Sequence, residues 1–173
     1  MKQFIAIIAI LLCSNASFAQ GNDALFNAAR NNDTTALQAL KTQNVSLELT
    51  NARGFTPLIL AVYNNSIEAT KFLINEKVDL NAQDQSGNTA LIGAAFKGNL
   101  EMVKLLLAGG ADINFANKNG ATALIFAATF GQEAIAKYLL DQGAKKDIKD
   151  ANGNTALDHA TKQENAALIN ILK

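Results

Sequence analysis

The sequence predicts an all-α solenoid of about five stacked helical hairpins, because several residue types recur at one fixed spacing. Four glycines lie 33 residues apart, and a threonine, a leucine and an alanine follow each of them in the same register. A period of this length is typical of supersecondary units that each bury an apolar flank on the next unit. The repeated positions are Gly54, Gly87, Gly120 and Gly153; Thr56, Thr89, Thr122 and Thr155; Leu58, Leu91, Leu124 and Leu157; Ala61, Ala94, Ala127 and Ala160; and Leu40, Leu73, Leu106, Leu139 and Leu172.

The opening of each unit resembles the T-P-L-H-x-A motif of the ankyrin repeat. It reads TPLILAV from Thr56 to Val62 and TALIGAA from Thr89 to Ala95. GNLEMVKLLLAGGADIN, from Gly98 to Asn114, is similar to the second helix and exit loop of that family. The resemblance extends over residues 21–173 and implies an ankyrin-repeat solenoid of helix-turn-helix units with β-turn fingers.

Residues 1–19 predict a cleavable signal peptide. Lys2 supplies a positive charge, Phe4 to Leu12 an unbroken apolar segment, and Ser17 to Ala19 the small residues that a signal peptidase requires. The apolar segment is short for a membrane span. A short leader followed by a chain without cysteine favours a bacterial protein in the periplasm or outside the cell. Lipidation at Cys13 and an uncleaved anchor are the alternatives, although a lipobox has a small residue where Leu12 stands.

Residues 20–173 are expected to form one ankyrin repeat domain. Its repeats are expected at about residues 21–50, 51–83, 84–116, 117–149 and 150–173. The first and last units carry polar substitutions, as terminal caps require. The last helix also carries four apolar residues that we expect to pack inward, with self-association as the alternative: Leu168, Ile169, Ile171 and Leu172.

Local signals mark the ends of the helices. A Thr56 hydroxyl followed by Pro57 favours the start of the first helix of a unit. The second helix is expected to begin after an N-cap residue at Asp33, Ser66, Asn99 and Asn165, with Gln132 as the exception. It should end in a left-handed residue at Gly110 and Gly143, and at Lys77 with mild strain. Pairs at helical spacing are expected on the exposed side at Glu68–Lys71, Glu101–Lys104 and Glu133–Lys137.

The residues that stand where the family has histidine are apolar. Ile59, Ile92 and Ile125 follow the repeated leucines, so this position must stabilise the stack by apolar packing rather than by a hydrogen bond. Burial of a side chain of this size contributes roughly 1.5–3 kcal/mol.

The composition argues against several functions. Lys plus Arg and Asp plus Glu both number 15, and charges of both signs are interleaved, so we expect no nucleic-acid partner, and no membrane partner after cleavage. The single histidine, His159, has Asp158 beside it but no placed nucleophile. The chain shows no cluster of metal-ligating residues and no phosphate-binding loop. We therefore predict a monomeric protein without enzymatic activity, metal or cofactor.

The resemblance places the binding surface on the fingers and on the exposed side of the first helices, which together line a concave groove. The candidate partner-binding residues are Arg53, Phe55, Tyr63, Asn64, Asn88, Phe96, Lys97 and Phe130. The rings of Tyr63, Phe96 and Phe130 form a stripe typical of an interface; the alternative is that they cover the seam between helices. If they bind, truncating Phe96 or Tyr63 should leave thermal stability nearly unchanged. We predict a scaffold or adaptor for a partner protein; the alternative is an inhibitor or immunity protein that blocks a toxin or hydrolase.

Overall fold

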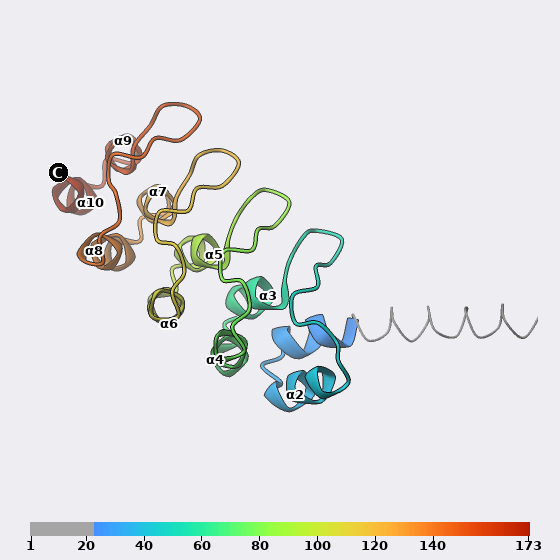
Figure 1. The fold of residues 1–173 in the computed structure, drawn as a ribbon. Helices are drawn as coiled ribbons and strands as arrows, with labels where there is room; N and C mark the ends of the chain where they lie inside the picture. The colour runs from blue at the N-terminus through green and yellow to red at the C-terminus, as the bar shows by residue number, and fades with distance from the viewer. Residues whose placement is uncertain (1–22) are drawn as a thin grey trace, which may run out of the picture.

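The structure is a computed structural model that describes residues 23–173 (Figure 1). The predicted leader, its cleavage site and Cys13 lie outside the described residues. The described part contains helices and no strand, which confirms the predicted ankyrin-type, all-α solenoid. After helical residues 23–30 the helices are α2 (Thr34–Thr42), α3 (Pro57–Tyr63), α4 (Ile67–Asn75), α5 (Ala90–Lys97), α6 (Leu100–Ala108), α7 (Ala123–Thr129), α8 (Glu133–Asp141), α9 (Ala156–Lys162) and α10 (Ala166–Leu172).

The helices form two parallel rows (Figure 1). Helices α3, α5, α7 and α9 pack on one another as an inner row, and α2, α4, α6, α8 and α10 form an outer row in the same order. The loop before each helix of α3, α5, α7 and α9 projects as a finger, and all four fingers project from the same side of the stack. The fingers and the inner row therefore share one continuous face, along which both hollows described below lie.

Threonine hydroxyls begin the inner helices as predicted. Thr56 Oγ1 accepts a hydrogen bond from the Ile59 N–H at 3.2 Å, and the threonines before α5, α7 and α9 do the same. Pro57 occupies the first turn of α3, where no helical hydrogen bond is lost. These caps fix the residue at which each finger ends and the inner helix begins.

The outer helices are capped as predicted, with one exception. Asp33, Asn99 and Asn165 accept from backbone N–H groups, and Gln132 does not. Ser66 holds the N-cap position, but its hydroxyl makes no capping bond and instead donates to the Arg30 carbonyl at 2.8 Å. Asn32 Oδ1, in the preceding repeat, accepts from the Ala69 N–H at 2.8 Å. The buried Ser66 thus joins two repeats, and Asn32 of the preceding repeat caps α4 in its place.

The repeated leucines and isoleucines form the core. Leu58, Leu91 and Leu124 and the isoleucines that follow them are almost completely buried, which confirms apolar packing at the position of the family's histidine. Leu73, Leu106 and Leu139 are fully buried at the outer row. In the last unit Leu157 is half-buried because no further repeat covers it. In α10, Leu168 and Leu172 are buried and Ile169 and Ile171 are half-buried, as expected for inward packing.

The fingers are joined by backbone hydrogen bonds. The N–H groups of Gln85, Lys118 and Ala151 each donate to a carbonyl of the preceding finger, at 3.2, 3.2 and 2.8 Å. A second ladder joins the loops that follow the outer helices, in which Asn81 Oδ1 accepts from the Asp112 N–H and Asn114 Oδ1 from the Lys145 N–H. The two ladders connect neighbouring repeats both at the fingers and at the loops that follow the outer helices, which fixes the fingers relative to one another.

Surface ion pairs agree with the prediction in part. Glu68 and Lys71 pair at 2.8 Å. Lys137 pairs with Asp141 at 3.1 Å instead of Glu133, whose carboxylate accepts from Asn165 Nδ2 of the next repeat. The Lys104 ammonium lies 5.5 Å from the centre of the Tyr138 ring and forms no ion pair with Glu101.

The predicted ends of the outer helices are confirmed. Gly110 and Gly143 have φ values of 99° and 89°, and Lys77 takes the same left-handed conformation at 58°. Within residues 23–173 no helix is both long and apolar enough to cross a membrane.

Candidate functional site

The candidate residues separate into two groups along the finger side of the stack. Arg53, Phe55, Tyr63 and Asn64 line a hollow between the first repeat and α3. Phe96 and Phe130 meet in an aromatic cluster at α5 and α7. Between the two groups lie Lys97, exposed at the end of α5, and Asn88, half-buried in a finger. The predicted stripe of three rings is therefore two sites, because Tyr63 pairs with Phe55 rather than with Phe96.

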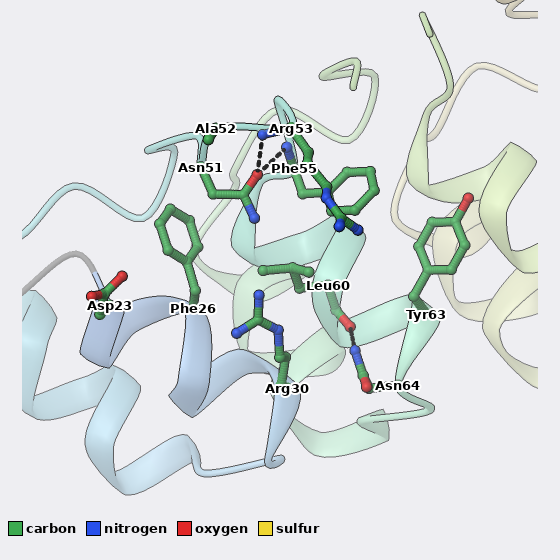
Figure 2. A pocket seen from close by; sticks show the side chains of 10 residues that line it. All are labelled: Asp23, Phe26, Arg30, Asn51, Ala52, Arg53, Phe55, Leu60, Tyr63 and Asn64. Atoms are coloured by element: carbon green, nitrogen blue, oxygen red, sulfur yellow. Dashed lines mark hydrogen bonds between the residues drawn. The ribbon is translucent and has the colours of Figure 1, made fainter. Parts of the chain in front are cut away.

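The first hollow has a volume of about 620 Å³ and opens between helical residues 23–30, the first finger and α3 (Figure 2). The rings of Phe55 and Tyr63 stack at its edge with centroids 5.8 Å apart. Asn64 Nδ2 donates to the Leu60 carbonyl, which holds that amide against α3. The lining residues are Asp23, Phe26, Arg30, Asn51, Ala52, Arg53, Phe55, Leu60, Tyr63 and Asn64.

Tyr63 also fills the seam between two repeats. A Cβ placed on Gly93 would lie 2.9 Å from Tyr63 Cε2, so the ring packs where α5 has no side chain. Burial raises the pKa of the Tyr63 phenol, and the nearby charge of Asp84 acts in the same direction. Because the ring is half-buried in this way, we now expect Tyr63→Ala to lower folding stability, contrary to the expectation from the sequence.

The aromatic cluster consists of Phe96, Phe126 and Phe130. The Phe96 and Phe130 rings meet edge to face with centroids 4.8 Å apart, and Phe126 lies parallel to Phe130 at 6.0 Å. Phe96 is 39% and Phe130 48% exposed, and they are the two large apolar side chains that the described part of the chain exposes. Such a pair of exposed rings on a half-buried third is typical of a binding surface.

Phe126 was not among the predicted residues, although a signal for it exists. It belongs to a series at the 33-residue spacing that reads Leu60, Gly93, Phe126 and His159. The series varies in size and polarity, whereas the positions before and after it keep one residue type in most units. All four face the finger side: Leu60 lines the first hollow, Gly93 receives Tyr63, and Phe126 and His159 line a second hollow.

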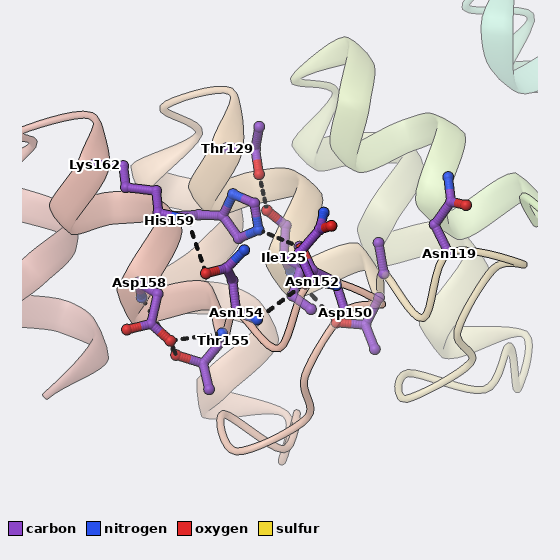
Figure 3. Close-up of polar contacts among 12 residues, drawn as sticks. Asn119, Ile125, Thr129, Asp150, Asn152, Asn154, Thr155, Asp158, His159 and Lys162 are labelled. Atoms are coloured by element: carbon purple, nitrogen blue, oxygen red, sulfur yellow. Dashed lines mark hydrogen bonds and ion pairs between the residues drawn. The ribbon is translucent and has the colours of Figure 1, made fainter.

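The second hollow, of about 460 Å³, lies beside the aromatic cluster between the last two fingers and helices α7 and α9 (Figure 3). Phe126 and Phe130 form its apolar wall, and Asn119, Asn152 and His159 supply polar groups. Thr129 Oγ1 donates to the Ile125 carbonyl at 2.8 Å, so this hydroxyl is held by its own helix. The hollow and the cluster form one continuous surface of mixed chemistry.

His159 is bound to Asp150 rather than to its sequence neighbour Asp158 (Figure 3). The distance from His159 Nε2 to Asp150 Oδ2 is 2.7 Å, and because a carboxylate only accepts, Nε2 carries the proton. Asp158 accepts instead from the Thr155 N–H and hydroxyl at 2.8 and 2.7 Å, closing a capping box at α9. These bonds hold the last finger against α9.

Asp150→Asn is expected to reduce the loss of stability on acidification. Donation from the Asn154 N–H and from His159 lowers the pKa of Asp150 in the fold. The ionised group therefore stabilises the fold above its unfolded pKa of about 3.9, and this contribution is lost as the pH falls through the folded pKa. Thermal melts between pH 7 and pH 3 should show wild type losing more of its melting temperature below pH 5 than the variant does.

The asparagine variant keeps the finger, which makes it a suitable probe of charge. Asn117 holds the equivalent position of the previous repeat, and its Oδ1 accepts from the Asn119 and Ala121 N–H groups as Asp150 Oδ1 does from Asn152 and Asn154. Parallel melting curves for the two proteins across this pH range would show that the Asp150 charge does not stabilise the fold.

Asn88 lies between two fingers. Its Oδ1 accepts from Asn117 Nδ2 at 2.8 Å, and its own Nδ2 donates to Asp84 Oδ2 at 3.2 Å. Both ends of the amide are thus engaged within the stack, which gives Asn88 a structural role in addition to the binding role predicted for it. In the part of the chain that the structure describes, no three acidic, histidine or cysteine side chains lie together as metal ligands.

Comparison with known families identifies the repeat. The model described as ankyrin repeats (3 copies) matches residues 3–84, 25–117 and 91–173. Among curated proteins, none matches the sequence significantly. Ankyrin repeat proteins are generally non-enzymatic scaffolds that mediate protein–protein interaction. Because the matches together extend over almost the whole chain and the fold agrees with them, the protein belongs to the ankyrin repeat family.

Proposed function

We propose that this protein is a binding scaffold that holds a partner protein, in the bacterial periplasm or outside the cell, through the finger side of its stack. The observation that carries the proposal is the exposure of Phe96 and Phe130, which meet edge to face beside the second hollow. Burial of two such rings gives a partner a large apolar contact, and aromatic residues of this kind dominate many interfaces.

The surface is prepared for rigid recognition. The two hydrogen-bond ladders hold the fingers at fixed spacings, and the rings are carried by α5 and by the residue that ends α7. A partner then loses little free energy in ordering the scaffold, because the binding residues are already in place. The face between the two hollows is long enough to present several repeats to one partner, as in other repeat proteins.

The export of the scaffold is argued from the sequence alone. A basic residue, an apolar segment and a small-residue cleavage site precede the repeats, and Cys13 is the single cysteine of the chain. A repeat domain without cysteine is insensitive to the oxidising conditions outside the cytosol. The partner is therefore proposed to be another protein of the same compartment.

Affinity capture with matched variants tests the proposal. Purified protein is used to capture partners from periplasmic, culture-medium and cytosolic fractions, with Phe96→Ser/Phe130→Ser as the site variant and Phe115→Ser as the control. Phe115 is half-buried and is not part of the core or of either hollow. We expect each lost ring to cost about 2 kcal/mol in binding, or roughly 30-fold, so the double variant should recover no partner.

The control and the unfolding transition decide the interpretation. Phe115→Ser should recover the same partner as wild type, and the double variant should unfold at nearly the wild-type temperature because both rings are exposed. Equal recovery by the double variant, or recovery only from cytosolic extract, would contradict the proposed site or the proposed compartment respectively.

A further inference from the structure

The two arginines of the sequence lie in the same hollow. Arg30 and Arg53 are its only arginines, and both line the first hollow, to which neither Phe96 nor Phe130 contributes. Arg30 comes from the first repeat and Arg53 from the first finger, so two separate elements supply the charges. Figure 2 shows the Arg30 guanidinium beside Phe26 and Leu60 and the Arg53 guanidinium beside the Phe55 ring, on two sides of the same hollow.

Both guanidiniums retain hydrogen-bonding capacity. Arg30 donates once, from Nη1 to Asn27 Oδ1 at 3.0 Å. The backbone of Arg53 is fixed by the finger, since its N–H donates to Asn51 Oδ1 and its carbonyl accepts from the Gln85 N–H. Within residues 23–173 neither side chain forms an ion pair. Each guanidinium carries five donors in a planar fork that matches a carboxylate.

Apolar side chains line the hollow beside the two arginines. Phe26 and Leu60 are buried in the wall of the hollow, and the stacked rings of Phe55 and Tyr63 close one side. A single carboxylate, Asp23, lines the hollow at its edge and is not paired with either arginine. The hollow thus combines two arginines and one aspartate, which give it a net positive charge, with an apolar and largely aromatic lining.

We propose that the first hollow receives an acidic segment of the partner protein, with a carboxylate between Arg30 and Arg53 and a neighbouring apolar side chain against Phe26 and Phe55. The inference deepens the proposed function and rests on it. The complementary charge is the argument for an acidic segment: two guanidiniums that line one hollow and form no ion pair with the described residues can stabilise a carboxylate by charge-assisted, bidentate hydrogen bonds. The balanced charge of the whole chain argues against nucleic acid as the occupant.

The arginine count makes a direct experiment possible. In a ¹H–¹⁵N spectrum of the labelled protein, the arginine Nε–H region should contain two signals, both of which report this hollow. The protein is titrated with the capped peptide acetyl-Glu-Phe-Glu-amide, with acetyl-Gln-Phe-Gln-amide as the neutral match, with acetyl-Gly-Phe as a peptide with a free carboxyl terminus, and with inorganic phosphate.

The acidic peptide should shift both Nε–H signals saturably, and the neutral peptide should not. Arg30→Gln or Arg53→Gln should weaken its binding about 10-fold, the usual effect of losing one charge-assisted pair. Lys145→Gln, which removes an equal charge from an exposed loop of the fourth repeat, should leave binding unchanged. Saturable shifts with acetyl-Gly-Phe alone would assign the carboxylate to a chain terminus and so overturn an internal acidic segment.

Four further outcomes would overturn the inference. Absence of any shift up to 5 mM acidic peptide (on the order of the weakest specific contacts), or equal shifts with the neutral peptide, would show that the hollow does not recognise charge. Shifts with phosphate at the same concentration would show a site for small anions. Capture that survives in Arg30→Gln/Arg53→Gln but is lost in Phe96→Ser/Phe130→Ser would refute this inference while leaving the proposed function intact.

Discussion

Leu106→Ala is expected to lower the free energy of unfolding by about 3 kcal/mol. Leu106 is fully buried in α6, between the equivalent leucines of the repeats before and after it, Leu73 and Leu139. The change removes buried apolar surface and leaves a cavity that the flanking helices cannot close, because finger and outer ladders hold them at fixed spacings. Urea unfolding followed by circular dichroism measures the loss.

The neighbouring residue supplies the matched control. Leu107 lies in the same helix and is half-buried, so Leu107→Ala makes the same chemical change with the same helix propensity but removes less buried surface. We expect its cost to be about 1 kcal/mol. If the two variants lost equal stability, the seam between repeats would not be the source of stability and the stacking argument would be wrong.

The core was predictable because equivalent positions of each repeat are buried against the neighbouring repeat in the same way. A position that is apolar in four units, such as Leu58 and its equivalents, must face a neighbour in every one of them. The caps were predictable for a similar reason, since a threonine or asparagine satisfies N–H groups of its own helix. Ser66 departs from this rule because its hydroxyl reaches the Arg30 carbonyl of the preceding repeat, and a distance between repeats is not contained in one unit's sequence.

The candidate site was predictable in part. Repeat position was enough to find Phe96 and Phe130, whose exposure follows from the side of the helix that they occupy. Phe126 was missed although it stands four residues before Phe130, a helical spacing that brings the two rings together. Its edge contact with Phe96 of the preceding repeat is the part that one unit's sequence does not contain. In the same way His159 is bonded to Asp150, nine residues earlier, because the last finger folds back on α9.

The position of the first repeat explains why Phe26, another residue of the hollows, was not predicted. Phe26 stands 33 residues before Ile59, which is buried between two repeats. In the described part of the chain no repeat precedes that of Phe26, so its ring packs under the first finger and forms the wall of the first hollow. The position that Ile59 occupies in the core of the stack is therefore occupied in the first repeat by Phe26, which lines a candidate binding surface.

Gly87→Ala is expected to cost about 2–3 kcal/mol of folding stability, and Gly153→Ala only about 1 kcal/mol. Both glycines have left-handed backbones, with φ values of 81° and 77°, so both variants carry the same steric penalty at Cβ. Only at Gly87 does a new Cβ meet the next finger, 2.7 Å from the Lys118 backbone nitrogen, whereas at Gly153 nothing lies within 4 Å.

The difference between these two variants isolates the contact between fingers. The Lys118 N–H donates to the Ser86 carbonyl, so displacing it breaks the hydrogen bond that joins the fingers before α5 and α7. Urea unfolding gives the stability of each variant, and hydrogen exchange at the Lys118 amide should accelerate in Gly87→Ala alone. Equal losses in the two variants, with Lys118 still protected, would mean that each finger is held by its own helices. The two binding surfaces would then be fixed relative to one another through the helices alone.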